Sequence, residues 1–183
     1  LAQAIPHESD CVLIRLMAFG GLRINECFAL QWPDIDLERK TLTVRQSVSD
    51  VNGRLIIGPT KTYATRTITL PDAIAAQLLT LKDSQSALAL VFPSRRGGYR
   101  RYGNWRRDVW NPACETSGLN VRPHDLRATC VSLLIDAGAS PKDVQAHLGH
   151  ESVETTMRWY ARVRPGRSED LATRLNTLIA EVP

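Results

Sequence analysis

Apolar residues recur with the period of a helix at the start of the chain. Between residues 12 and 17 they fall on one helical face, and Gly20 and Gly21 are typical helix terminators. Ser9 or Asp10 is the expected N-cap, because both side chains accept hydrogen bonds from the free N–H groups of a first turn. A second, shorter helix is expected over residues 24–30.

The pattern then changes to that of β-strands. Residues 41–48 are rich in β-branched side chains, and Asn52-Gly53 is a strong hairpin signal. Residues 54–58 and 66–70 have the character of two further strands, joined by a polar link. We therefore expect a small three-stranded antiparallel sheet.

The remainder of the chain has helical periodicity between loops. A helix that starts at Pro71 is followed by an irregular region over residues 84–103. Further helices are expected over residues 102–116, 123–137, 140–148 and 152–160, and after Pro165. The pattern predicts one domain over residues 1–183, with a mainly α fold and a small three-stranded antiparallel β-sheet (α+β).

Composition limits the class of protein without naming a function. The 183 residues are 43% hydrophobic and 23% charged, as in ordinary globular proteins, and the net charge of +4 permits an anionic partner. The four cysteines never form a C-x-x-C pair, which favours free thiols in a reducing, cytoplasmic compartment. No membrane span or secretory signal is recognisable. Because the chain starts at Leu1, we expect the protein to have a further N-terminal domain outside this chain.

Two arginines stand at the beginnings of predicted helices, where anions are favoured. Arg23 follows the glycine pair, and Glu26, one turn later, can hold its guanidinium. Arg127 lies three residues after His124 on a helix that Pro123 starts, so the two side chains share a face. Each pair also has an ordinary explanation: a plain ion pair for Arg23, and a helix-capping role for His124 with Arg127 bonded to an acid.

The remaining candidate residues indicate a function only in combination with the others. Lys61 lies in the polar link between the second and third strands, and Tyr160 ends a predicted helix; a solvated turn lysine and a packing tyrosine are the alternatives. His147 and His150 could ligate a metal, but Gly149 breaks the helix between them and no Cys or Glu completes a ligand set. We therefore expect no metal, with His147 as an exposed helix residue.

Together these residue types suit metal-free phosphoryl transfer. Arginines clamp the nonbridging oxygens of a phosphodiester, a tyrosine supplies the attacking oxygen, and a cationic group protonates the departing alkoxide. A tyrosine has an unperturbed pKa of about 10, so a nearby base or strong electrostatic assistance must activate it.

Five short motifs occur in a fixed order. They are Gly21-Leu22-Arg23-Ile24-Asn25-Glu26, Thr60-Lys61-Thr62 before Arg66-Thr67-Ile68, His124-Asp125-Leu126-Arg127, Leu148-Gly149-His150 and Tyr160-Ala161. With them the chain resembles the catalytic domain of the tyrosine recombinase (phage integrase) family over nearly its whole length. The resemblance implies that family's catalytic-domain fold and an enzyme that integrates and recombines DNA at specific sites, without a metal or nucleotide cofactor.

The resemblance also implies roles at the scissile phosphate. Arg23 and Arg127 would clamp the phosphate, and Glu26 would support the first of them. Lys61 would be the general acid for the leaving 5′-hydroxyl, and His150 would donate a hydrogen bond to the phosphate.

The remaining roles concern the nucleophile. In the family the tyrosine most often falls nine positions after the histidine of Leu-Gly-His, and in a subset ten; here the ninth position is Trp159 and the tenth is Tyr160. Tyr160 is therefore the expected nucleophile, forming a 3′-phosphotyrosyl link, and His124 would assist proton transfer at its hydroxyl.

The implied partners are double-stranded DNA, further protomers of the same recombinase in a synaptic tetramer, and DNA-bending accessory proteins, in a nucleoid-associated cytoplasmic setting. A basic stretch is expected to meet the DNA backbone, with a solvated loop as its alternative. Its members are Arg95, Arg96, Arg100, Arg101, Arg106 and Arg107. An apolar stripe over residues 171–182 would pack either on its own domain or on a neighbouring protomer.

Two other functions stay open. One is a DNA-binding module that has lost catalysis, and the other is an enzyme like a type IB topoisomerase, which nicks and reseals one strand. A covalent adduct separates the recombinase from the first, and recombinant products separate it from the second.

Overall fold

Two apolar cores, one large and one small, organise the described part of the chain. The computed structural model describes residues 1–60, 65–83, 89–150 and 152–163, apart from the side chains of 161–163. The large core joins helices α1 (Glu8–Gly20), α2 (Ile24–Ala29) and α3 (Asp72–Asp83) to the β-region. The short 3₁₀ helices η1 (Ala2–Ala4) and η2 (Trp32–Asp34) lie at its edge.

The β-region consists of two small sheets. β1 (Ile35–Asp36), β2 (Thr41–Val44) and β5 (Arg66–Thr69) form an antiparallel sheet in the order β1-β2-β5. β3 (Gln46–Val51) and β4 (Arg54–Pro59) pair separately as a hairpin. The predicted turn lies at its tip, where both central residues have positive φ.

A three-stranded antiparallel sheet is therefore present, but its strands differ from the predicted ones. The expected strand over 41–48 divides at Arg45, whose Nε donates to Asp34 Oδ1 at 3.1 Å, and its second half joins the hairpin. The buried positions Leu42, Val44 and Val48 keep the same phase across the break. Periodicity reports which face is buried and not which strand is the neighbour, so it could not show this change.

The predicted helix over 102–116 is helical throughout but not uniform. α4 (Tyr102–Trp105) passes into a π-helical turn, η3 (Arg106–Trp110), and then into α5 (Asn111–Ser117). Pro112 has no N–H to offer an α-helical carbonyl, and a wider turn before it accommodates the missing bond.

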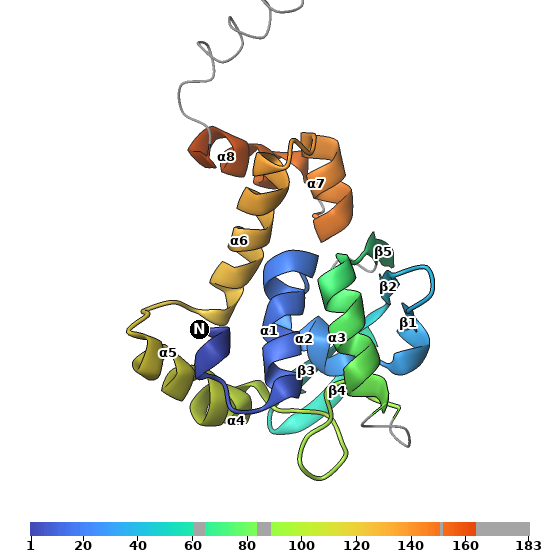
Figure 1. Cartoon of the computed structure of the whole chain (residues 1–183), viewed down its shortest axis with the longest axis vertical. Helices are drawn as coiled ribbons and strands as arrows, with labels where there is room; N and C mark the ends of the chain where they lie inside the picture. Colours follow the sequence, from blue (N-terminus) through green and yellow to red (C-terminus); the bar gives the residue numbers. More distant parts are fainter. Residues whose placement is uncertain (61–64, 84–88, 151, 164–183) are drawn as a thin grey trace, which may run out of the picture.

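Three helices carry the small core. α6 (Pro123–Asp136) packs along α1 and leads to α7 (Pro141–Leu148) and α8 (Val153–Val163) at one end of the molecule (Figure 1). α6 and α7 match their predicted ranges to within one residue, and α8 continues three residues past its predicted end at residue 160. The helix expected after Pro165, with its apolar stripe, lies outside the described residues.

Asp10 has an interior role that its predicted place as an N-cap did not suggest. α1 begins at Glu8 with His7 at the N-cap, so Asp10 lies within the first turn and is only 3% exposed. Its carboxylate accepts a hydrogen bond of 2.8 Å from Trp105 Nε1 and pairs with the Arg100 guanidinium. The ion pair thereby fastens the segment before α4 to α1.

None of the helices in the described part of the chain has the length and apolar character needed to cross a bilayer.

We expect Asp10→Asn to lower the free energy of unfolding by about 2 to 4 kcal/mol, because it leaves the half-buried Arg100 without its counter-ion. Urea denaturation measures this as a lower midpoint with an unchanged slope. Asp108→Asn, which disrupts an exposed pair with Arg107, is the control and should leave the midpoint nearly unchanged. Equal midpoints for the two variants would contradict the assignment.

Candidate active site

The predicted contact between Arg23 and Glu26 forms at the start of α2. Arg23 is the N-cap, and its backbone N–H donates to Glu26 Oε2 at 2.9 Å. Its Nη1 donates to Glu26 Oε1, also at 2.9 Å. The carboxylate thus satisfies a free backbone donor of the helix and orients the guanidinium of the same residue.

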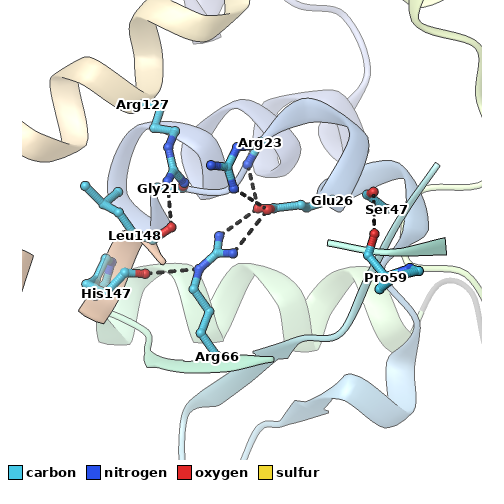
Figure 2. A network of polar contacts seen from close by, with 9 residues as sticks. All are labelled: Gly21, Arg23, Glu26, Ser47, Pro59, Arg66, Arg127, His147 and Leu148. Carbon is cyan, nitrogen blue, oxygen red and sulfur yellow. Dashed lines mark hydrogen bonds and ion pairs between the residues drawn. The ribbon is translucent and has the colours of Figure 1, made fainter. Parts of the chain in front are cut away.

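A second arginine, which the sequence analysis did not single out, holds Glu26 from the opposite side (Figure 2). Arg66 on β5 makes a two-pronged contact with Glu26, at 3.1 Å from Nη1 to Oε1 and 2.7 Å from Nη2 to Oε2. Its Nε donates to the His147 carbonyl on α7 at 3.1 Å. The alternation of β5 could have revealed it, because Arg66 shares the buried face with Ile68.

The neighbouring arginines determine the ionisation state of Glu26. Burial alone would raise the pKa of this carboxyl, but the hydrogen bonds and charge of Arg66, followed by those of Arg23, outweigh burial and hold the pKa below its ordinary value. Glu26 is therefore ionised at neutral pH, and its negative charge balances the positive charge of one of its two guanidinium partners.

Arg127 contributes the third guanidinium group of this region. Two glycines leave space for the side chains around it. Its Nη1 donates to the Gly21 carbonyl and its Nη2 to the Leu148 carbonyl at 2.5 Å. Gly21 has φ +67°, and a Cβ there would lie 2.4 Å from Leu148 Cδ2. Gly149 has φ +64°, and its Cβ would lie 2.9 Å from Arg66 Cδ. Both positions need a residue without a side chain.

Arg127 carries a buried charge close to other charges of the same sign. It is 3% exposed, and burial, then the charges of Arg23 and Arg66, lower its pKa to about 9. It still holds its proton at pH 7. Among the described residues, three guanidinium groups thus lie beside the one carboxylate of Glu26, an arrangement suited to an anionic ligand.

A cavity of about 420 Å³ opens beside these charges. The starts of α2 and α6 form one part of its wall, and the β3–β4 hairpin and Tyr102 form another. The predicted site residues on its wall are Arg23, Glu26, His124 and Arg127.

The two predicted histidines are both neutral at pH 7. Burial, then the charges of Arg127 and Arg23, lower the pKa of His124. The same causes in the same order, with a further contribution from Arg66, lower the pKa of His150 to about 4. His150 Nδ1 lies 3.0 Å from Thr156 Oγ1. Each ring is thus an uncharged donor or acceptor beside the arginines.

The structure places Tyr160 in the small core. The residue is 8% exposed among side chains of α6 and α7, and its hydroxyl donates to the Ala139 carbonyl. The predicted nucleophile is therefore directed at a backbone carbonyl, whereas the predicted phosphate clamp lines the cavity. Lys61 lies outside the described residues.

The basic stretch divides into two arginines that contact other parts of the fold and four arginines that are exposed. Arg100 is bound to Asp10 and to the Pro93 carbonyl, so we assign it to the fold instead of to the DNA backbone. Arg101 joins the hairpin through Asp50 and the Gly53 carbonyl. The exposed members are Arg95, Arg96, Arg106 and Arg107.

His147 is half-buried and not the exposed helix residue that the sequence predicts, because its ring packs near Arg66 and the Gly20 backbone. Within the described residues, no group of three or more His, Cys, Asp or Glu side chains is placed to hold a metal ion.

Comparison with known proteins decides the family. The model of the phage integrase family matches residues 2–167. The chain belongs to the phage integrase family. It is 28% identical over 180 residues to an integrase of Mycobacterium phage D29, covering 94% of this chain and 48% of that relative. It is 31% identical to the tyrosine recombinase XerC of Roseiflexus sp. (strain RS-1), covering 94% of this chain and 55% of that protein. The chain spans about half the length of these curated relatives.

Solved structures confirm the predicted fold. The integrase of transposon Tn1549, solved in complex with transposon right-end DNA, superposes with a TM-score of 0.79 at 17% identity, over 94% of this chain and 59% of that one. The catalytic domain of bacteriophage HP1 integrase superposes with a TM-score of 0.62 at 18% identity, over 98% of this chain and 89% of that one. The α+β fold of a recombinase catalytic domain is thus shared.

We expect Arg66→Met and Glu26→Gln each to destabilise the protein, and the double variant to lose less than the sum of the two. Each single change leaves a buried charge with one partner fewer, so the coupling free energy should be about 1 to 3 kcal/mol. A double-mutant cycle in urea measures it. Additive effects would show that the two side chains do not act as a pair.

The histidine pKa values predict how stability depends on pH. Unfolded histidine takes up a proton near pH 6.5, whereas folded His150 resists protonation until about pH 4. The unfolded state therefore binds more protons between these values, and the free energy of unfolding falls as the pH is lowered through this window. His124 and His147 act in the same direction.

His150→Gln should reduce this slope by up to about one proton. Urea titrations at several pH values measure the slope, with His7→Gln, which replaces an exposed histidine, as the control. An unchanged slope in His150→Gln would contradict the assignment.

Proposed function

We propose that the chain is the catalytic domain of a site-specific DNA recombinase, which cuts and rejoins DNA strands without a metal through a 3′-phosphotyrosyl intermediate. The observation that carries the proposal is the gathering of Arg23, Arg66 and Arg127 around Glu26 beside a cavity. Membership of the integrase family supports it, as does the sequence similarity to proteins named integrase and tyrosine recombinase.

The charge of the site suits one phosphodiester. Within the described residues, three guanidinium groups and one carboxylate leave two positive charges, and a phosphodiester brings one negative charge. Arg23 and Arg127, which line the cavity, would contact its nonbridging oxygens, while Arg66 holds Glu26. These donors stabilise the charge that builds on the phosphate as the phosphorus becomes five-coordinate.

The cleavage step forms one bond and breaks another. The Tyr160 oxygen bonds to phosphorus as the bond to the 5′-oxygen breaks. The phenol proton passes to a base, for which the neutral His124 ring on the cavity wall is suited. The leaving 5′-oxygen takes its proton from Lys61. A 5′-hydroxyl from a partner duplex reverses the step, so one phosphodiester is exchanged for another and no nucleotide is consumed.

Catalysis by this route requires the Tyr160 hydroxyl to leave the Ala139 carbonyl and reach the phosphate. We infer that the end of α8 that carries Tyr160 is repositioned when DNA binds. The implied partners are duplex DNA, further protomers in a synaptic tetramer and DNA-bending proteins, and the expected setting is the nucleoid. Arg95, Arg96, Arg106 and Arg107 are the exposed candidates for backbone contacts.

We expect Tyr160→Phe to abolish covalent attachment to DNA while lowering the free energy of unfolding by only about 0.5 to 1.5 kcal/mol, the contribution of one hydrogen bond. The test incubates the full-length protein with nicked duplexes from the DNA that flanks its gene, in the presence of a chelator. Detergent-stable adducts are then counted. Tyr99→Phe, a tyrosine packed on the large core, is the matched control.

The outcomes separate three functions. An adduct in the wild type and in Tyr99→Phe, lost in Tyr160→Phe, with recombinant products, supports the recombinase. An adduct with relaxed supercoils and no recombinants would indicate a topoisomerase-like enzyme. Binding at a footprinted site without any adduct would indicate a DNA-binding module that has lost catalysis.

A further inference from the structure

The main chain of His150 is held from both sides by one residue of α7. The His150 N–H donates to the Gln145 carbonyl at 3.1 Å, and Gln145 Nε2 donates to the His150 carbonyl at 3.1 Å. Gly149, with φ +64°, turns the chain between them. With the backbone fixed in this way, the imidazole can still rotate, so its orientation depends on what its ring nitrogens contact.

One ring nitrogen meets a buried hydroxyl. Thr156 on α8 is 0% exposed, and its Oγ1 lies 3.0 Å from His150 Nδ1. A buried hydroxyl needs an acceptor for its hydrogen. In the described part of the chain, His150 Nδ1 is the hydrogen-bond partner of this side chain.

We propose that Thr156 is a positioning residue for His150: its hydroxyl donates to Nδ1 and so keeps the ring hydrogen on Nε2, as a donor for the scissile phosphate. A neutral imidazole carries one N–H, so an Nδ1 that accepts requires an Nε2 that donates. The reverse arrangement would turn a lone pair of Nε2 toward an anion. The step toward catalysis rests on the proposed function; the tautomer does not.

The surroundings agree with a neutral donor. Burial of the ring, and after it the charges of Arg127, Arg23 and Arg66, lowers the pKa of His150, so the imidazole stays uncharged at pH 7. A neutral ring needs a defined tautomer to act as a donor, whereas a doubly protonated ring would not. The Thr156 hydroxyl selects the tautomer whose hydrogen is on Nε2.

Thr156 also connects the proposed nucleophile, Tyr160, with the proposed phosphate donor, His150. It lies one helical turn before Tyr160, so both side chains project from the same buried face of α8. The contact therefore ties the helix that carries the proposed nucleophile to the proposed phosphate donor.

The tautomer is tested first, without DNA. Nitrogen-15 NMR of the imidazole of His150 at pH 7, assigned with His150→Gln, should show a protonated Nε2 and an unprotonated Nδ1. Thr156→Ser should keep this pattern, and Thr156→Val should give a mixture of tautomers. A protonated Nδ1 in the wild type would overturn the proposal.

The rate is tested next, as single-turnover formation of the covalent adduct at saturating nicked duplex. Thr156→Val should slow it about 10- to 100-fold, as expected for a misplaced hydrogen-bond donor, while DNA affinity stays unchanged. Thr156→Ser should return the rate to within about 3-fold of the wild type. Thr155→Val, an exposed neighbour on the same helix, is the matched control.

Each result has a distinct meaning. Equal losses in Thr156→Ser and Thr156→Val would reduce Thr156 to a packing role and overturn the proposal. A wild-type protein with the expected tautomer but no adduct at its bound site would overturn the proposed function alone, and the assignment of the Thr156 hydrogen bond would stand.

Discussion

The carboxylate of Glu26 is the contact on which the site depends, because it joins the start of α2 to β5 directly and, through Arg66, to α7. It caps α2 through the Arg23 N–H, orients the Arg23 guanidinium, and receives both prongs of Arg66 from β5. Arg66 in turn holds the His147 carbonyl of α7. Residues 26, 66 and 147 are far apart in sequence, so this one anion fixes the relative positions of a helix start, a strand and the small core.

The same network carries an electrostatic cost that a stable fold alone would not explain. Burying ion pairs rarely adds stability over apolar packing, and here the positive groups outnumber the negative one. Burial, and after it the charges of Arg23 and Arg66, lowers the pKa of Arg127. Groups held in such an unfavourable state are typical of sites prepared for a ligand that completes the charge balance. Two carbonyls, of Gly21 and Leu148, hold Arg127 in place until such a ligand arrives.

The sequence predicts local features well and long-range contacts poorly. The helix starts at Pro123 and Ser140 follow from capping chemistry, and the turn at Gly21 follows from its needed backbone freedom. Arg66 lies in one of the five motifs, but its role could not be predicted because it depends on a partner forty residues away. The change of sheet at Arg45 could not be predicted for the same reason, since strand pairing is a property of the whole fold. The contact of Asp10 with Arg100 likewise spans most of the chain, and a capping residue and a buried ion-pair acid look alike in sequence.

The proposed phosphate clamp and the proposed nucleophile belong to different cores. The free energies involved explain how Tyr160 can leave its core reversibly. The clamp residues stand on the large core or at its border, whereas Tyr160 belongs to the small one. Withdrawing an aromatic ring from such a core costs roughly 2 to 3 kcal/mol, and its hydrogen bond to Ala139 adds about 1 kcal/mol. A protein that contacts several phosphates of a duplex gains more than this on binding, since each contact releases counterions. Without DNA, the packed position of Tyr160 is favoured and the phenol is kept from the cavity. In the proposed mechanism, a cost of this size is small enough for DNA binding to overcome and large enough to keep Tyr160 packed when DNA is absent.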